Sequence, residues 1–291
     1  MPQHSATPLL HSAFYRFVPL ADPSATAQAL RALAQDLKGS IVVAHEGING
    51  TVAGHPQAVA AFEAALQQDE LLDGALRGMR FKHSGCSTEP FGRLKLSVKS
   101  EIVALGLPAP SGPGPGTGTG TPLPPPDEHD ASHLSPQAWR ELLARDDLVL
   151  LDNRNHFEFR LGHFKGALDP QVHNFRDFVA FVQAQAPAWR AAGRPVAMYC
   201  TGGIRCDKTA PWLRSLGLDV WQLEGGVLNY LQSVDDAHRD WLGECFVFDN
   251  RLALDSQLNE TDTSADQVFD ASQPDEAWRL QRARRLLDPG S

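Results

Sequence analysis

The chain has 291 residues and a formal net charge of -9 at pH 7, with 42% hydrophobic and 21% charged residues. This length favours two domains of ordinary size, and no apolar run in the sequence is long enough to cross a bilayer. The negative net charge disfavours indiscriminate nucleic-acid binding, because the field of the whole molecule repels phosphates. A nucleic-acid site therefore has to be a local basic patch.

The N-terminal stretch and the cysteines indicate the cellular compartment. The sequence MPQHSATPLLHSAF has neither the basic start nor the sustained apolar core of a secretory signal, so we expect a cytoplasmic protein without a membrane partner. The cysteines include no CxxC pair and fit neither a disulfide framework nor a zinc module. We therefore expect no metal site and four reduced thiols, at Cys86, Cys200, Cys206 and Cys245.

Residues 1–105 are predicted to form an α+β domain. The run AFYRFVPL is typical of a strand, and apolar spacing predicts helices over residues 23–38 and 56–67. Between them, GSIVVAHEGINGTVAG predicts two strands joined at Asn49-Gly50, because this pair suits a tight hairpin turn. Strand-like pieces near GMRFKHS and GRLKLSVKSEIV complete a β-α-β-β-α-β order, which predicts a ferredoxin-like (acylphosphatase-like) fold.

Residues 106–128 are rich in Pro, Gly and Thr and are predicted to be a linker. In the domain expected over 129–250, Ser135-Pro136 is a favourable helix start. Buried strands (LVLLD, PVAMYC, DVWQLEGG) then alternate with helices (FRDFVAFVQAQ, DKTAPWLRSLG, VLNYLQSV), the second of which is expected to be interrupted at Pro211. This alternation predicts an α/β domain whose parallel sheet is covered on both faces.

Residues 251–291 form a predicted C-terminal tail. Its segment EAWRLQRARRLL is compatible with a basic helix. Such a helix would either contact a nucleic-acid backbone or dock its apolar side on the preceding domain. The same sequence pattern is compatible with both roles.

The stretch YCTGGIRCDKTAPWL places Cys200 between a predicted strand and a predicted helix. Ligands of parallel sheets bind beyond the carboxyl ends of the strands, where Asp152 also falls. Loop N–H groups, the helix dipole and the charge of Arg205 would favour a nucleophilic thiolate. The alternative is a cysteine packed as a small apolar residue. The predicted site comprises catalytic Cys200 and an anion-binding loop of Thr201, Gly202, Gly203, Ile204 and Arg205.

The second domain resembles a rhodanese domain, through LLDNRNHFEFRLGHFKGA, the Cys200-x-x-Gly-x-Arg205 loop and LEGG. The loop encloses four residues where related cysteine phosphatases use five, which disfavours a phosphatase. With EGINGTVAG, SEIVALG, LEGGVLNYL and GECFVFDNR, residues 13–250 further resemble the bacterial tRNA uridine(34) hydroxylase family. Members of that family combine a ferredoxin-like or acylphosphatase-like domain with a rhodanese domain.

This resemblance implies an oxidoreductase that converts the wobble uridine of tRNA to 5-hydroxyuridine. It implies molecular oxygen as co-substrate and tRNA as partner, while the reductant and the oligomeric state stay undetermined. The sequence has no flavin, haem or iron motif, so no cofactor is expected. Three features depart from the family. Asn153 replaces the usual threonine, and the Pro/Gly-rich linker is longer and more biased in composition than in other members. No cysteine follows Cys245, so a role of the cysteine-rich tail of other members is not carried over.

For several residues around the loop, a structural role is the alternative to a direct role in function. Asp152 and Arg154 are expected to brace the pocket by charge-assisted hydrogen bonds. Cys206 is either a helper or resolving thiol or a packing residue. Three further residues are expected to be structural, namely His163, Cys86 and Cys245.

Residues 77–99 carry six basic residues and one acid, Glu89, in an otherwise acidic chain. This cluster is a candidate tRNA-binding face, and its alternative is an ordinary solvated strand face. The six are Arg77, Arg80, Lys82, Arg93, Lys95 and Lys99.

Two further functions are compatible with the same residues. A sulfurtransferase would carry a persulfide on Cys200 and would need no RNA. A non-catalytic RNA-binding adaptor would retain the fold without the chemistry, and the intact Cys200 and Arg205 count against it.

Overall fold

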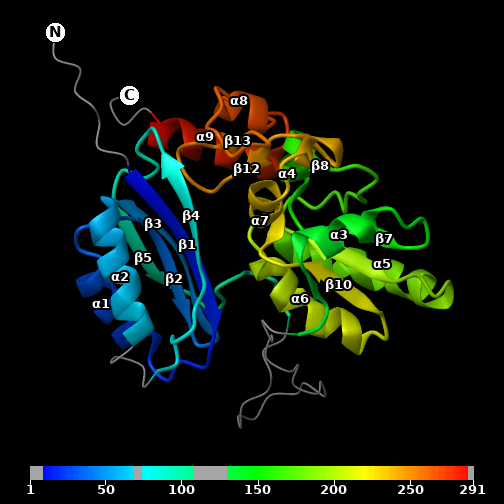
Figure 1. Ribbon diagram of the computed structural model, residues 1–291, viewed down its shortest axis with the longest axis horizontal. Helices are drawn as coiled ribbons and strands as arrows, with labels where there is room; N and C mark the ends of the chain where they lie inside the picture. The colour runs from blue at the N-terminus through cyan, green and yellow to red at the C-terminus, as the bar shows by residue number, and fades with distance from the viewer. Residues whose placement is uncertain (1–8, 69–73, 108–129, 288–291) are drawn as a thin grey trace. The chain divides into compact units, whose positions relative to one another are not determined.

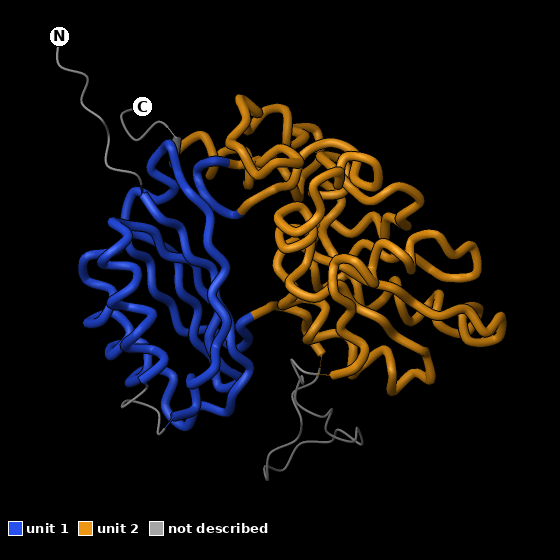
Figure 2. Tube along the Cα trace, in the orientation of Figure 1, with its two compact units in different colours: residues 1–102, 248–251, 286–291 blue, residues 103–247, 252–285 orange. Residues whose placement is uncertain are grey.

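The computed structural model describes residues 9–68, 74–107 and 130–287, which divide into two compact units (Figures 1 and 2). Unit 1 takes in residues 1–102 with 248–251 and 286–291, and unit 2 takes in 103–247 with 252–285. Of the predicted linker, 106–128, all but Gly106 and Leu107 lies outside the described residues. None of the helices in the described ranges is long and apolar enough to span a membrane.

Unit 1 is a five-stranded sheet with two helices on one face (Figure 1). The strand order is β4-β1-β3-β2-β5, and every neighbouring pair is antiparallel except β2 and β5. This confirms the ferredoxin-like prediction, with β5 as an additional edge strand. The bounds are β1 Leu9–Phe17, α1 Pro23–Leu33, β2 Lys38–Ala44, β3 Gly47–Gly54, α2 Pro56–Gln68, β4 Phe81–Cys86 and β5 Leu94–Val98.

The core of unit 1 lies between the sheet and its helices. Phe14, Ile41 and Val52 belong to different strands and point to the same face, as the strand period of two dictates. Leu30 of α1 and Phe62 of α2 pack against them. The opposite face of the sheet is therefore formed by the intervening residues of each strand.

The hairpin between β2 and β3 turns at His45 and Glu46, so the predicted turn at Asn49-Gly50 is wrong. Asn49 lies within β3 and donates a hydrogen bond from Nδ2 to the carbonyl oxygen of Ile102 at 3.1 Å. A Cβ atom on Gly50 would lie 2.7 Å from the ring of Phe14. Gly50 thus leaves room for the ring of Phe14 in the core. In the sequence, a glycine needed for such packing looks the same as a glycine needed for a turn.

Unit 2 is built on a parallel four-stranded sheet of order β6-β10-β9-β7. Helices α5 and α6 pack on one face and α3 and α7 on the other, which confirms the predicted doubly covered sheet. The bounds are β6 His133–Leu134, α3 Pro136–Leu143, β7 Val149–Asp152, α5 Phe178–Ala191, β9 Val196–Tyr199, α6 Ile204–Ser215, β10 Val220–Leu223 and α7 Gly226–Ser233.

Helix α6 passes through Pro211 without interruption, contrary to the prediction. Proline removes an N–H donor and strains an interior helical turn. Ala210 and Leu213 on either side of it are fully buried in the core between α6 and the sheet. This packing keeps the helix continuous. The rule that an interior proline interrupts a helix considers only local sequence, so it does not include this tertiary packing.

The remaining elements of unit 2 extend the domain beyond the sheet. Helix α4 carries Phe157, which packs with Phe246 and with Leu280 of α9 in a separate apolar cluster. Glu276 of α9 is fully buried and accepts a hydrogen bond from Arg160 at 2.6 Å. The C-terminal helix therefore docks on unit 2. The bounds are α4 His156–Leu161, β8 Gly162–Phe164, η1 Phe175–Asp177, η2 Ala237–Arg239, β11 Trp241–Gly243, β12 Cys245–Phe246, β13 Ala253–Leu254, α8 Ala265–Val268 and α9 Pro274–Leu287.

Candidate active site

The predicted Cys200 loop forms a cradle of backbone amides around the sulfur. Strand β9 ends at Tyr199, and α6 starts at Ile204, so the chain turns within four residues. Gly203 has a φ of 99° and donates its N–H to Cys200 Sγ at 3.1 Å. The amides of Arg205 and Cys206 also donate to this sulfur. The loop is therefore preorganised to hold negative charge.

The thiol of Cys200 is acidic. Burial alone would raise its pKa above the ordinary value of 9.0, but the hydrogen bond from the Cys206 thiol, the charge of Arg205 and the loop amides lower the pKa to about 5. Burial and the neighbouring thiolate raise the pKa of Cys206 well above its ordinary value, so Cys206 stays protonated and donates. Cys200 is therefore a thiolate at neutral pH and a nucleophile.

The acidity of Cys200 predicts how its alkylation varies with pH. Because only the thiolate reacts, the rate of labelling by iodoacetamide should rise to a plateau with a midpoint near the pKa of about 5. Cys206→Ala removes one donor to the thiolate and should raise the midpoint by about one to two pH units. Labelling of the Cys200 peptide is measured by mass spectrometry. A native midpoint near the ordinary thiol value would contradict the amide cradle.

Glu158 of α4 fixes Arg205. Its carboxylate accepts two hydrogen bonds from the Arg205 guanidinium, each of 2.7 Å, and both side chains are buried. Thr201 Oγ1 donates to Glu158 Oε1 at 3.3 Å, and the N–H of Asn155 donates to Oε2 at 3.1 Å. Burial would raise the pKa of Glu158, but the charge of Arg205 lowers it below the usual range. Glu158 is thus ionised and ties α4 to the loop.

Sequence reasoning gave Glu158 no role of its own in the site. The only local signal is a glutamate three residues after Asn155, the spacing of a helix capping box, of which the structure has the hydrogen bond from the Asn155 N–H to Glu158. A second residue missed is Phe175, a partly buried aromatic whose ring centroid lies 5.9 Å from Cζ of Arg205. Both residues approach Arg205 only because the chain folds back on the loop.

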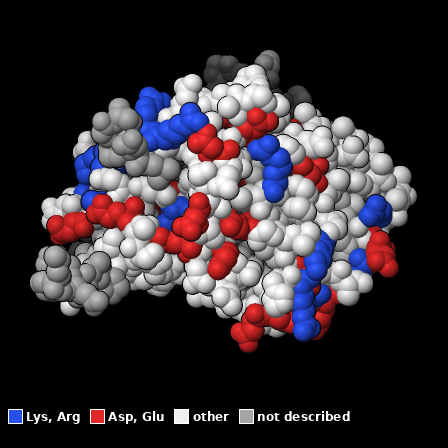
Figure 3. Space-filling view, turned by 90° about the horizontal axis from the view of Figure 1, so that it is seen from above, with Lys and Arg blue, Asp and Glu red and all other residues white. Residues whose placement is uncertain are grey.

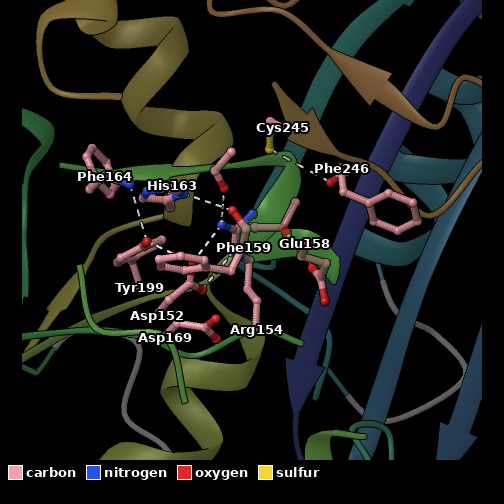
Figure 4. Close-up of polar contacts among 12 residues, drawn as sticks. Asp152, Arg154, Glu158, Phe159, His163, Phe164, Asp169, Tyr199, Cys245 and Phe246 are labelled. Carbon is pink, nitrogen blue, oxygen red and sulfur yellow. Dashed lines mark hydrogen bonds and ion pairs between the residues drawn. The ribbon is translucent and has the colours of Figure 1, made fainter. Parts of the chain in front are cut away.

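Asp152 and Arg154 form a buried ion pair below the site (Figure 4). Nε and Nη2 of Arg154 donate to the two carboxylate oxygens of Asp152 at 2.8 and 2.7 Å, and Tyr199 Oη donates to Asp152 Oδ2 at 2.7 Å. Burial would lower the pKa of Arg154, but the charge of Asp152 raises it well above its ordinary value. Arg154 also donates to the carbonyl of Gly162 at 2.6 Å. These contacts link the ends of β7 and β9, so the pair braces the site.

Asn153, the departure from the usual threonine, lies under the second cysteine. Its Nδ2 donates to Thr209 Oγ1 at 2.8 Å and to Cys206 Sγ at 3.7 Å, and all three side chains are buried. The start of α7 closes on the loop from another direction. A Cβ atom on Gly226 would lie 2.4 Å from the carbonyl oxygen of Cys200, and the φ of Gly226 is 70°. Glycine is required there by this close approach.

The residues interpreted as structural make packing contacts. His163 Nδ1 lies 2.9 Å from the carbonyl oxygen of Phe159, and the two rings stack with centroids 3.9 Å apart (Figure 4). Cys245 is fully buried, and burial raises its pKa to about 12, so it is protonated at neutral pH. Cys86 is buried at the end of β4.

The six candidate tRNA-binding residues divide into two groups within unit 1. Strands β4 and β5 are the opposite edges of the sheet. One group precedes or lies on β4 (Arg77, Arg80, Lys82), and the other flanks or lies on β5 (Arg93, Lys95, Lys99). The two groups therefore lie at opposite edges of the sheet, and their role in tRNA binding stays a prediction. On the face shown in Figure 3, Lys and Arg side chains are interspersed with Asp and Glu.

Both units match known families. Residues 10–102 match the UPF0176 acylphosphatase-like domain, and residues 135–233 match the rhodanese-like domain. The assignment of the cysteine loop to a rhodanese domain thus agrees with the fold and with its amide cradle.

Relatives extend the similarity over most of the chain. A Nitrobacter winogradskyi protein is 42% identical over 91% of this chain and 98% of its own length. Proteins of Deinococcus radiodurans and Synechococcus elongatus are 40% and 43% identical over 90% and 84% of this chain, and over 81% and 85% of their own lengths. All three are named tRNA uridine(34) hydroxylase. With both domains matched and the Cys200 loop intact, the chain belongs to the tRNA uridine(34) hydroxylase family.

Proposed function

We propose that this protein hydroxylates C5 of uridine 34 in tRNA, with molecular oxygen as co-substrate and Cys200 as the catalytic nucleophile. The observation that carries the proposal is a thiolate with a pKa of about 5, held by loop amides, in a chain whose relatives are named for this reaction. The wobble base is unpaired in the anticodon loop. It can therefore be splayed out toward an enzyme pocket at little cost in base pairing.

The chemistry that the thiolate supplies is activation of C5. Addition of Cys200 Sγ to C6 of uracil forms an S–C6 bond, and the electron pair of the C5=C6 bond moves onto the C4 carbonyl as an enolate. C5 is then electron-rich and attacks an electrophilic oxygen. Loss of the C5 proton and expulsion of the thiolate restore the C5=C6 bond and free the enzyme.

The oxygen balance sets one further requirement. One atom of molecular oxygen enters the product, and the other leaves as water after taking up two electrons and two protons. An external two-electron reductant must therefore take part in each turnover.

The loop amides are the donors best suited to the enolate. In the structure both terminal nitrogens of Arg205 donate to Glu158, and Nη2 also donates to Thr201 Oγ1 at 3.3 Å, while the charge of Arg205 acts on the thiolate. Preorganised backbone donors stabilise developing negative charge without reorganisation.

The test compares wobble nucleosides by mass spectrometry in tRNA from cells with and without the gene. We expect 5-hydroxyuridine and its derivatives to disappear on deletion and to return with the native gene. Purified protein added to deletion-strain extract, which supplies the reductant, should form 5-hydroxyuridine in air and none under argon. Unchanged nucleosides together with thiocyanate formation from thiosulfate and cyanide would instead identify a sulfurtransferase, because persulfide transfer uses the same loop.

A further inference from the structure

Cys206 lies beside the nucleophile, yet no bond in the proposed mechanism forms or breaks at its sulfur. It belongs to the first turn of α6, which begins at Ile204, and only 1% of its surface is exposed. Its backbone N–H and its thiol both donate hydrogen bonds to Cys200 Sγ. The Cys206 side chain therefore already points at the Cys200 sulfur.

No other cysteine lies in the same core cluster as this pair, within the ranges that the structure describes. Cys245 belongs to the cluster on the opposite face of the sheet of unit 2, and Cys86 belongs to unit 1. All four cysteines are free thiols. If the Cys200 sulfur is oxidised, the thiol beside it is that of Cys206.

A polar side chain is directed at the Cys206 sulfur. Asn153 Nδ2 donates to Cys206 Sγ at 3.7 Å and to Thr209 Oγ1 at 2.8 Å, and Asn153 is fully buried. A cysteine that only filled space would need no donor beneath it. The Asn153 amide stabilises negative charge on Cys206. This sulfur carries that charge when it leaves a disulfide as a thiolate.

We propose that Cys200 and Cys206 form a reversible disulfide when a hydroperoxide oxidises Cys200. Cys200 is the sulfur that the oxidant attacks, and Cys206 is the thiol that resolves the product. The disulfide removes the nucleophilic thiolate until a dithiol reduces it. This redox site goes beyond hydroxylation and does not rest on it, because only the two cysteines and the oxidant take part.

The oxidation proceeds in two steps. The Cys200 thiolate attacks one oxygen of the hydroperoxide, so that an S–O bond forms and the O–O bond breaks. The second oxygen takes up a proton and leaves as water or an alcohol, and the sulfur, having lost two electrons, is a sulfenic acid. The Cys206 sulfur then attacks the Cys200 sulfur. The S–S bond forms, the S–O bond breaks, and the oxygen leaves as water with the thiol proton of Cys206.

The first step also prepares Cys206 for the second. Burial is the largest cause of the raised pKa of Cys206, and the hydrogen bond to the Cys200 thiolate and its charge raise the pKa further. A neutral sulfenic acid carries no such charge, so oxidation of Cys200 lowers the pKa of Cys206. Cys206 is therefore held as a thiol while Cys200 is a thiolate, and it becomes a better nucleophile once Cys200 is oxidised.

The test maps disulfides in the full chain after treatment with hydrogen peroxide. Trypsin cleaves after Arg205, so Cys200 and Cys206 fall into separate peptides, the second of which is the short segment 206–208. We expect mass spectrometry to find these two peptides linked in the native protein, and dithiothreitol to separate them. Iodoacetamide labelling of Cys200 should be lost on oxidation and return almost completely after dithiothreitol.

Two variants separate the resolving thiol from other buried thiols. In Cys206→Ala the sulfenic acid on Cys200 is oxidised further to a sulfinic acid, which dithiothreitol does not reduce. Labelling should then recover to less than about a tenth of its initial level. Cys245→Ala lacks a different buried thiol and is the matched control. It should form the same linked peptides as the native protein and recover its labelling.

A sulfinic acid on Cys200 without linked peptides in the native protein would overturn the proposal, as would a disulfide between Cys200 and any other cysteine. Labelling of Cys200 that peroxide leaves unchanged would overturn it too. The native peptide map gives these results even if Cys206→Ala does not fold. Disulfide mapping needs no RNA, so failure of the proposed function is a different outcome. A protein that forms no 5-hydroxyuridine but links the two peptides keeps the redox site, whereas a hydroxylase that never links them lacks it.

Discussion

Cys200→Ala should abolish formation of 5-hydroxyuridine, with a loss of at least about 10³-fold in rate. In the proposed mechanism the thiolate makes and breaks the bond to C6, and we expect that Cys206 does not replace it, because burial is the largest cause of its raised pKa and persists in the variant. The variant should fold and bind tRNA normally, since alanine fills most of the space of a cysteine. Nucleoside mass spectrometry of tRNA incubated with each variant in deletion-strain extract measures the loss.

Cys245→Ala is the control for the loss of a buried thiol. Cys245 is as buried as Cys200, yet burial raises its pKa to about 12, so it has no nucleophilic role at neutral pH. We expect this variant to keep native hydroxylation. Full activity in Cys200→Ala would exclude covalent catalysis by Cys200. Full activity in Cys245→Ala is the expected control result and is consistent with the assignment of Cys200 as the nucleophile.

Glu158→Ala should lower the free energy of unfolding by about 3 to 5 kcal/mol and inactivate the enzyme. Removing the carboxylate leaves the Arg205 guanidinium buried without its charge partner, which costs far more than an exposed pair would contribute. The same change releases the hydrogen bonds that Glu158 accepts from Thr201 and Asn155, so the loop loses its anchor on α4. Urea denaturation of the full chain gives the stability.

An exposed ion pair of the same bidentate form provides the matched control. Arg145 donates to both oxygens of Asp147 at 2.8 Å, and both side chains are largely exposed. Asp147→Asn should therefore leave the stability close to that of the native protein, because solvent screens an exposed pair. In Glu158→Gln with Arg205→Met neither member of the ion pair keeps a charge, so this double variant should regain stability relative to Glu158→Ala but not activity. Equal, small decreases in the free energy of unfolding for Glu158→Ala and Asp147→Asn would contradict this prediction. They would show that burial does not increase the contribution of the Glu158–Arg205 pair to stability.

The fold class was predictable because it depends on local patterns. Alternating apolar strands and helices indicated the parallel sheet of unit 2, and the spacing before the linker indicated the ferredoxin-like order of unit 1. The two local errors share one cause. Gly50 and Pro211 were interpreted by turn and helix rules, but the ring of Phe14 and the core around α6 decide what these residues do.

By itself the sequence determined that a cysteine follows a strand, that glycines and an arginine follow the cysteine, and that these residues form a thiolate loop. All of those features lie within six residues, so local chemistry is sufficient to predict them. Only the tertiary structure decided which side chains hold the loop. Glu158 and Arg205 are 47 positions apart, and Asn153 and Cys206 are 53 apart. Such contacts arise from the packing of α4 and β7 against the start of α6, which places charges and donors together at distances that no sequence spacing encodes.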